Sequence, residues 1–323
     1  MLPAHGQSSE LTERKAIRSS AFTDVKNANF ERLEALAEEY RNPTARTASG
    51  VWKLTYFYSG IAAALHSQRK DPAIWSAKQK LVANWVRRYP KSPSAHLAYA
   101  EMLVNRGWAY RGDGYANTVA PENWKPFKQY LQQAREYLEK NKQIAAADPQ
   151  FYAQMISLAS VQGWSEAELT PLLEEGLSRF PEYYGIYFAA VRYWDPKWGG
   201  NAASLEQFAQ DALKRTQPSE GYGMYTRIYW YASENQYGNN LFSESQAKWS
   251  LMKKGIADIL AKYPDNWNIN SLAFFACLAR DRAETAALVE RIDTPIPEAW
   301  ADALENYQRC RTWAQPRSRP VDE

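Results

Sequence analysis

The most constraining feature of this sequence is a three-and-four spacing of apolar residues that recurs along nearly the whole chain. Two representative sets are Phe30, Leu33, Leu36, Ala37 and Tyr40, and Leu205, Phe208, Ala209, Ala212 and Leu213. Residues at this spacing share one face of an α-helix. No segment alternates apolar and polar residues between hairpin turns, as a β-strand would. The sequence therefore predicts an all-α fold of about thirteen helices.

A recurring phrase marks where helices end. Three amphipathic segments close with a basic residue, an aromatic residue and a proline: Arg88-Tyr89-Pro90, Arg179-Phe180-Pro181 and Lys262-Tyr263-Pro264. Proline stops a helix because it lacks an N–H group and clashes with the preceding turn. Start signals are also present. Asp71 precedes Pro72, and Ser165 with Glu168 and Ser204 with Gln207 fit capping boxes.

The alternation of helix, proline and second helix resembles the tetratricopeptide repeat, a hairpin unit of about 34 residues that ends with proline. Pro149 and Pro181 are separated by nearly that unit, and Ala100 and Ala159 follow Pro90 and Pro149 at the same distance, where helices must approach closely. Other proline spacings do not fit the unit, so the repeats are degenerate. We expect a right-handed, tetratricopeptide-like stack of antiparallel helical hairpins, an α-solenoid.

Several segments resemble a bacterial family of uncharacterised tetratricopeptide-like proteins. The resemblance rests on Val51–Leu54, Gly112–Val119, Trp194–Asn201, Arg227–Trp230, Tyr263–Asn268 and Ala276–Asp281, and it covers about residues 30 to 300. That family has no established activity. The resemblance therefore implies a helical-repeat fold and assigns no catalytic residue. It also implies that a leader peptide precedes the folded part in some members.

The expected domain organisation is simple. Residues 1–20 are polar and are predicted to be a flexible N-terminal segment. Residues 21–312 hold the helical periodicity and are predicted to form a single helical-repeat domain. Residues 313–323 are predicted to be a flexible tail, because they are polar and rich in proline and charge.

The charge balance and hydropathy of the sequence argue against nucleic acid as a partner and against a membrane-spanning helix. The 39 Lys and Arg residues nearly balance the 36 Asp and Glu residues, so the sequence lacks the basic stripe typical of nucleic-acid binding. No apolar stretch approaches the roughly 20 residues that a membrane-spanning helix needs. We expect a soluble protein, either cytoplasmic or exported after removal of a leader. The oligomeric state does not follow from the sequence.

The two cysteines, Cys277 and Cys310, exclude a small disulfide scaffold. Cys277 lies in an apolar run and is predicted to be a buried, inert thiol. Whether it pairs with Cys310 stays open. With three histidines in the chain and no metal-binding or phosphate-binding motif, we expect neither a metal nor another cofactor.

Aromatic content is high, with 13 Trp, 21 Tyr and 11 Phe, together 14% of the chain. Two loops combine aromatic residues with glycine and polar residues. The candidate binding residues in these loops are Trp108, Tyr110, Asp113, Tyr115, Trp194, Asp195, Trp198 and Asn201. Each ring has a second interpretation, since large rings also fill the space between packed helices.

Two function classes follow from these features. The first is a non-enzymatic interaction module that binds a protein or peptide partner through a concave or loop-lined aromatic surface. The second is an all-α enzyme acting on carbohydrates or other small molecules, with Asp113 and Asp195 as its two carboxylates. The first is preferred because no catalytic motif is present, and no residue is assigned a catalytic role.

Overall fold

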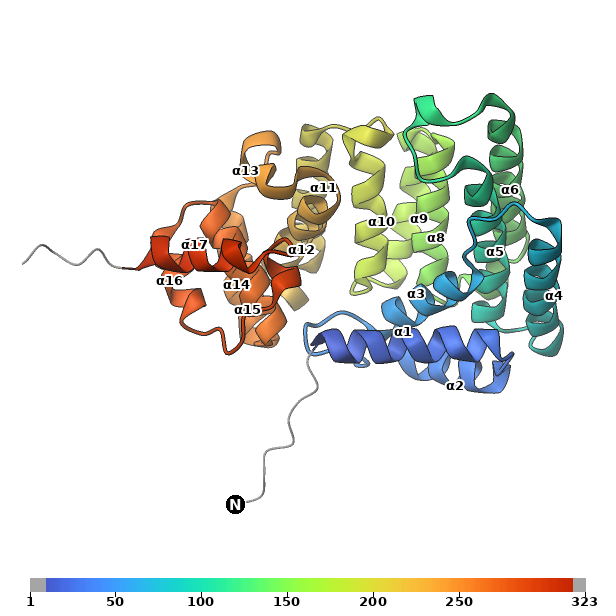
Figure 1. The fold of residues 1–323 in the computed structure, drawn as a ribbon, viewed down its shortest axis with the longest axis horizontal. Helices are drawn as coiled ribbons and strands as arrows, with labels where there is room; N and C mark the ends of the chain where they lie inside the picture. The colour runs from blue at the N-terminus through green and yellow to red at the C-terminus, as the bar shows by residue number, and fades with distance from the viewer. Residues whose placement is uncertain (1–9, 316–323) are drawn as a thin grey trace, which may run out of the picture. The chain divides into compact units, whose positions relative to one another are not determined.

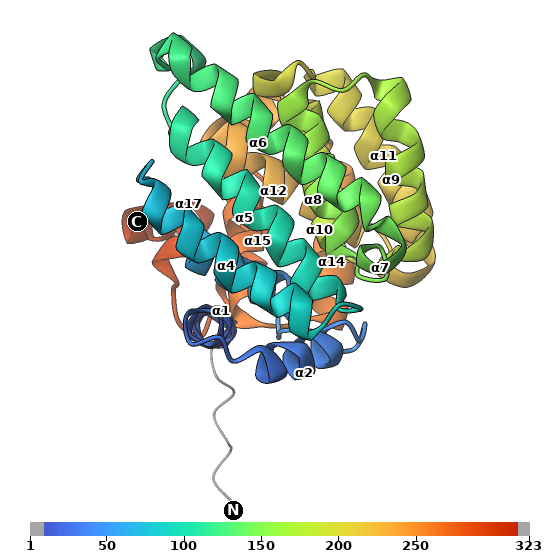
Figure 2. The same ribbon diagram turned by 90° about the vertical axis from the view of Figure 1, so that its right-hand side faces the viewer.

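The computed structural model describes residues 10–315, and the regular elements of this range are helices (Figure 1, Figure 2). The only β-type pairing within it is an isolated bridge between Arg46 and Trp52. The predicted all-α class is confirmed. The expected number of about thirteen helices is too low, because the described residues form α-helices up to α17. Two of these, α7 and α13, are only four residues long and leave no periodic pattern to detect.

The described chain divides into two compact units. The first, here the N-terminal unit, comprises residues 14–47 and 51–199. It holds most of α1 (Glu10–Lys26), and α2 (Phe30–Tyr40), α3 (Lys53–Leu65), α4 (Pro72–Arg88), α5 (Pro93–Arg111), α6 (Pro121–Lys140), α7 (Lys142–Ala145), α8 (Gln150–Gln162), α9 (Glu166–Arg179) and α10 (Tyr184–Trp194). Short 3-10 turns cover Ala116–Thr118 and Pro196–Trp198.

The second, here the C-terminal unit, comprises residues 10–13, 48–50 and 200–315 of the described chain. It holds α11 (Ala202–Glu220), α12 (Gly223–Ala232), α13 (Leu241–Glu244), α14 (Trp249–Lys262), α15 (Asn266–Leu278), α16 (Arg282–Val289) and α17 (Leu304–Ala314). A π-helical turn, Ser233–Tyr237, continues α12, and 3-10 turns cover Gly238–Asn240 and Pro297–Trp300.

These boundaries change the predicted domain organisation. α1 begins at Glu10, so ordered structure starts well inside the segment 1–20 that is predicted to be flexible. α17 continues to Ala314, slightly beyond the predicted end of the domain at residue 312. The range 21–312, predicted to be a single domain, is divided between the two units. Residues 1–9 and 316–323 lie outside the described residues.

Helix ends follow the sequence closely. The three basic–aromatic–proline phrases end α4, α9 and α14. The aromatic residue is the C-cap each time, with φ between −130° and −135° and ψ between 61° and 70° at Tyr89, Phe180 and Tyr263. Each cap donates its N–H to the carbonyl four residues earlier. One local rule therefore produces the same geometry three times.

Helix starts are predicted less well. Asp71 caps α4, and Ser165 forms a capping box with Glu168 at the start of α9, as the sequence predicts. The predicted cap at Ser204 is wrong. α11 begins three residues earlier, because Asn201 Oδ1 accepts the N–H groups of Ala203 and Ser204, both at 2.9 Å. Asn is among the strongest N-cap residues.

Neighbouring helices pack in pairs within each unit. In the N-terminal unit α5 packs against α6 and α8 against α10, and α4, α5, α6 and α8 lie side by side (Figure 1, Figure 2). In the C-terminal unit α11 packs against α12 and α15 against α16. Gly176 shows why small residues matter at such contacts. A Cβ atom there would lie 2.7 Å from the ring of Tyr152, so α8 and α9 need a glycine to approach this closely.

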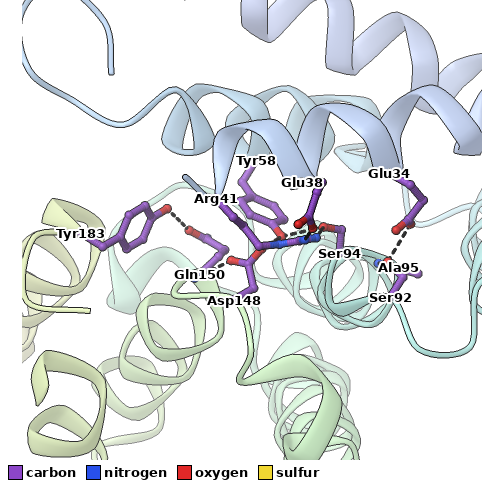
Figure 3. Close-up of polar contacts among 10 residues, drawn as sticks. All are labelled: Glu34, Glu38, Arg41, Tyr58, Ser92, Ser94, Ala95, Asp148, Gln150 and Tyr183. Carbon is purple, nitrogen blue, oxygen red and sulfur yellow. Dashed lines mark hydrogen bonds and ion pairs between the residues drawn. The ribbon is translucent and has the colours of Figure 1, made fainter. Parts of the chain in front are cut away.

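A buried ion pair fastens the N-terminal helices of this unit to the hairpins (Figure 3). Arg41, directly after α2, donates from Nε to Asp148 Oδ2 at 2.8 Å and from Nη2 to Ser94 Oγ at 3.1 Å. The Tyr58 hydroxyl donates to the same Asp148 oxygen at 2.7 Å. The second oxygen of Asp148 accepts the Gln150 N–H at 2.9 Å. Burial raises the pKa of Tyr58 well above its ordinary value, which keeps this hydroxyl protonated as a donor.

A second contact of α2 lies in the same region (Figure 3). Glu34 Oε1 accepts the indole N–H of Trp85 at 2.7 Å and the hydroxyl of Ser92 at 2.6 Å. The Ser92 oxygen in turn accepts the N–H of Ala95 at 3.0 Å and so caps α5. α2 is therefore tied to the end of α4 and the start of α5 by side chains that also satisfy a helix terminus.

The C-terminal unit encloses a short piece of the N-terminal sequence. Ser49, which is 1% exposed, donates from N and Oγ to the Glu10 carboxylate at 2.9 and 2.8 Å. Its carbonyl accepts from Arg227 Nη2 at 2.7 Å and from Asn268 Nδ2 at 3.2 Å. Gly50 follows at φ +92°, where a Cβ atom would meet a ring carbon of Tyr263 at 2.7 Å. The backbone of residues 48–50 is thus part of this unit's core.

Cys277 and Cys310 form a disulfide between α15 and α17, 33 residues apart in sequence. The predicted inert thiol at Cys277 is therefore wrong. Cys277 lies at the end of α15, where a half-buried side chain can reach α17. Within residues 10–315, no helix combines the length and the apolar character needed to cross a membrane.

Loss of the disulfide tests its contribution to stability. Cys310→Ser should lower the free energy of unfolding of the C-terminal unit by about 3–4 kcal/mol, the loop-closure value for a link across this separation. Denaturant unfolding with and without dithiothreitol measures the effect. The reductant should shift the transition of the parent protein and leave that of the Cys277→Ser/Cys310→Ser double variant unchanged. Identical parent transitions with and without reductant would contradict the assignment.

Removal of Asp148 tests how much its buried ion pair with Arg41 contributes to stability. Asp148→Ala should destabilise the N-terminal unit by about 3–5 kcal/mol, because Tyr58 and the Gln150 N–H lose their buried acceptor and Arg41 keeps only the exposed Glu38 as a counter-charge. The matched control is Glu139→Ala, which removes the half-exposed pair with Arg135 at 2.8 Å and should cost less than about 1 kcal/mol. Urea unfolding followed by circular dichroism compares the two. Equal shifts would mean that burial adds nothing to the importance of Asp148.

Candidate functional site

The first predicted loop contributes rings that pack on α6. The Trp108 ring lies 5.1 Å from that of Phe127, and the Tyr110 ring stacks on Tyr130 at 5.9 Å. Tyr115 is the most exposed of the large hydrophobic side chains described, at 84%. The segment predicted to be a loop therefore belongs partly to α5, which carries the packed rings of Trp108 and Tyr110, and only Tyr115 lies after that helix with its ring exposed.

The second predicted loop has a mainly structural role. The Trp194 ring packs on its neighbour Tyr193 at 4.7 Å, and Asp195 is 8% exposed at the end of α10. Trp198 is half-buried in the 3-10 turn that follows. Asn201 serves as the N-cap of α11 and belongs to the C-terminal unit. This loop therefore ends one helix and begins another.

The two proposed carboxylates have different surroundings. Asp113 is exposed and accepts a hydrogen bond from Gln68 Nε2 at 3.4 Å. Asp195 is buried, and its carbonyl accepts the Trp198 N–H at 2.9 Å. Neither residue lines the groove described next. A catalytic pairing of Asp113 with Asp195 remains a prediction.

A groove of about 480 Å³ runs along one face of α6, and we call it the α6 groove. Its α6 residues follow the three-and-four spacing of one helix face. The opposite wall comes from the end of α8, the following turn and the start of α9. The lining residues are Trp124, Phe127, Lys128, Leu131, Gln132, Arg135, Val161, Gln162, Gly163, Trp164 and Glu168.

Rings and cations alternate in and beside the groove. The Arg135 guanidinium lies over the Trp164 ring, 4.1 Å from its centre. Arg111 lies 5.0 Å from the ring centre of Trp108 and 5.7 Å from that of Trp124. Cations held over indole faces keep their charge available on the open side. The groove therefore offers flat apolar surfaces next to positive charge.

The turn after α8 positions Trp164. Gly163 ends α8 in the left-handed region, with φ 69° and ψ 41°. The Trp164 N–H reaches back to the Ala159 carbonyl at 3.0 Å, and its own carbonyl accepts the Tyr193 hydroxyl at 2.7 Å. The first of these bonds is typical of a helix that ends at glycine, and the second is a tertiary contact with α10. They fix the backbone from which the indole projects.

The α9 wall contributes an acidic side chain to the groove. Glu168 Oε2 accepts the N–H and the hydroxyl of Ser165 at 2.8 and 2.7 Å. These hydrogen bonds hold the pKa of Glu168 below its ordinary value. The Glu168 carboxylate thus forms part of the capping box at the start of α9. Lys128 and Arg135 are the basic residues that line the groove, and Arg135 also pairs through Nε with Glu139 at 2.8 Å.

The sequence indicates the first loop but not the residues that make the groove, chiefly Trp124, Lys128, Arg135 and Trp164. A signal for α6 is present in the sequence, because Trp124, Lys128 and Arg135 share the spacing of the apolar face at Phe127 and Leu131. Nothing local indicates that Trp164 faces them, since that depends on how α8 packs against α6.

Comparisons with known proteins add no relative. No family model matches the chain, and neither the curated proteins nor the solved structures contain a match. The resemblance to a bacterial tetratricopeptide-like family therefore remains a prediction.

The conformation of Gly163 has a measurable consequence. Gly163→Ala should destabilise the N-terminal unit by about 1 kcal/mol, because a Cβ atom is disfavoured in the left-handed region. A Cβ at this position meets no described atom within 4 Å, so the cost comes from the backbone alone. Gly163→Asn should cost less, because Asn tolerates this region better. Denaturant unfolding of both variants checks the order, and an equal or reversed order would contradict it.

Proposed function

We propose that this chain is a non-enzymatic, tetratricopeptide-like helical-repeat module that binds a protein or peptide segment through the α6 groove. The observation that carries the proposal is the combination of Trp124 and Trp164 with Lys128 and Arg135 in one groove between helices. Trp and Arg are the residues most enriched among the dominant contacts of protein interfaces. An aromatic site of this kind also fits the interaction-module class favoured by the sequence.

The side-by-side arrangement of α4, α5, α6 and α8 supports the repeat interpretation (Figure 2). In a stack of helical hairpins, each pair covers its neighbour and leaves a continuous surface for an extended ligand. We infer that the helices form a right-handed α-solenoid of this type. The three identical helix ends at Tyr89, Phe180 and Tyr263 are consistent with degenerate repeats.

The lining of the groove suggests the composition of its ligand. Aromatic or branched aliphatic side chains would pack on Trp124 and Trp164, which are half-buried and present flat faces. Carboxylates would pair with Arg135 and Lys128. The exposed Tyr115, in the segment between α5 and α6, offers a further contact outside the groove. We therefore expect an acidic segment interrupted by apolar residues.

The disulfide bears on the compartment. Disulfides persist in oxidising environments and are rare in reducing ones. The Cys277–Cys310 bond therefore favours the exported one of the two compartments considered from the sequence. The partner would then be a protein of the same oxidising compartment.

Selection from a random peptide library tests the proposal, because such a library contains many combinations of acidic and apolar residues and is not biased toward one partner. A 12-residue display library panned against the purified chain should yield peptides with Asp or Glu next to aromatic or aliphatic residues. Binding of synthetic peptides is then measured by fluorescence anisotropy. Trp164→Ala and Arg135→Ala should each weaken it by at least about tenfold, the effect of a dominant interface residue.

The matched control uses a lysine on the same helix. Lys125→Ala and Lys128→Ala remove the same charge from α6, but only Lys128 lines the groove. Lys128→Ala should weaken binding several-fold, and Lys125→Ala should leave it unchanged. Circular dichroism of each variant confirms that the helices persist. Two results would exclude the α6 groove as the binding site. One is the absence of any peptide that binds saturably, and the other is equal binding by the parent, Trp164→Ala and Arg135→Ala.

A further inference from the structure

The C-terminal unit contains a second hollow whose chemistry is opposite to that of the α6 groove. It has a volume of about 440 Å³ and lies among α12, the π-helical turn, α15 and the segment around Pro297–Trp300. We call it the acidic pocket. The residues that carry the argument are Trp230, Glu234, Ser271, Phe274, Glu298 and Asp302.

Aromatic rings form one part of the acidic pocket. Trp230 contributes a half-buried ring from α12, and its centre lies 6.1 Å from that of Phe275. Phe274 lines the pocket next to Phe275 and packs on Trp300 at 5.4 Å. A cation gains electrostatic attraction over the face of such rings, and Trp is the best of them.

Three carboxylates, those of Glu234, Glu298 and Asp302, also line the pocket. None of the described residues that line it is Lys, Arg or His. Glu298 and Asp302 are exposed at one side. Glu234 lies on the π-helical turn, where its Oε1 accepts the indole N–H of Trp230 at 2.6 Å. This bond fixes the ring and the carboxylate relative to each other. The charged side chains that line the pocket are therefore all acidic, which favours a cation.

The hydroxyl group of Ser271 is buried and lacks a hydrogen-bond partner among the described residues. Ser271 is 3% exposed and lines the pocket from α15. Leaving a buried hydroxyl unpaired costs about 1–3 kcal/mol. Rotation of the Ser271 side chain toward the pocket that it lines would bring this hydroxyl within reach of a polar group of a ligand.

The backbone around the pocket departs from ordinary helix and loop geometry. The π-helical turn Ser233–Tyr237 inserts a residue into the line of α12, and such turns are frequent at functional sites. Ala301 and Asp302 both have positive φ, 56° and 58°, although neither is glycine. Trp300 holds this segment by donating from its indole to Asn270 Oδ1 at 2.9 Å. The strained backbone places Asp302 at the pocket.

We propose that the acidic pocket binds an organic cation, an alkylammonium or guanidinium group. The cation would lie against Trp230 and Phe274, pair with Glu298 and Asp302, and donate a hydrogen bond to Ser271. A bare metal ion fits less well. Such ions require several oxygen ligands at short distance, and residues 10–315 contain no group of three His, Cys, Asp or Glu side chains arranged for one. The proposal is independent of the α6 groove.

Three probes test the charge requirement on the full-length, oxidised protein, and two of them are matched in shape. N-acetyl-arginine amide carries a guanidinium group, N-acetyl-citrulline amide is its neutral analogue, and tetramethylammonium is a cation without N–H donors. Saturation-transfer NMR and calorimetry should show saturable binding of both cations, weakened by added salt. The citrulline probe should bind at least tenfold more weakly than the arginine probe. Equal binding of the two would overturn the proposal.

Variants locate the binding. Glu298→Gln/Asp302→Asn should weaken both cations by at least tenfold, and Asn is suited to residue 302 because it tolerates positive φ. The control Glu305→Gln/Asp293→Asn removes the same charge from exposed positions that do not line the pocket, and should change binding by less than twofold. Equal losses in both double variants, or none in the first, would place the cation elsewhere and overturn the proposal.

Ser271→Ala separates hydrogen bonding from charge. It should weaken the arginine probe several-fold and leave tetramethylammonium unchanged, because only the first can donate to the hydroxyl. Loss of both or of neither would remove Ser271 from the site. Butylguanidine, a free guanidinium compound with the same single charge as N-acetyl-arginine amide, distinguishes the source of the ligand. Tighter binding of butylguanidine than of N-acetyl-arginine amide indicates a free small molecule, and the reverse order indicates an arginine side chain of a peptide.

Discussion

The N-terminal unit depends on the ion pair between Arg41 and Asp148. A buried pair stabilises a fold only when its geometry satisfies nearly every polar atom, since both charges lose their hydration. Tyr58, Ser94 and the Gln150 N–H supply those remaining contacts. The pair therefore sets position as well as energy. Asp148 lies just before α8, so its contacts fix where that helix begins. The far end of the same helix forms part of the wall of the α6 groove, and its position therefore depends on the same contacts.

Much of the fold is predictable because its signals are local. Each basic–aromatic–proline phrase ends a helix at the predicted residue, since a proline acts on its own preceding turn wherever the phrase occurs. Competition between neighbouring signals explains the failure at α11. Asn201 and Ser204 can both cap a helix, and the sequence gives no measure of which forms first; Asn201 does so with two N–H groups.

The candidate site is less predictable because it depends on contacts between residues far apart in sequence. Trp108 and Tyr110 stand out by composition, yet their rings pack on α6, whereas Trp164 faces the groove because α8 packs against α6. The disulfide is a similar case. Cys277 looks like a core residue within its apolar run, and only the approach of α17 shows that it pairs with Cys310.

The net charge of the chain is only +3, yet the two sites have charged linings of opposite sign. Exposed charges are screened beyond about 8–10 Å at physiological ionic strength, so a ligand responds to the residues that line its own site. Lys128 and Arg135 next to indole rings favour carboxylates, and Glu298 and Asp302 next to Trp230 favour cations. The aromatic content therefore has a second use besides core packing. Rings provide flat, apolar contact in both places, and the neighbouring charges decide what each can bind.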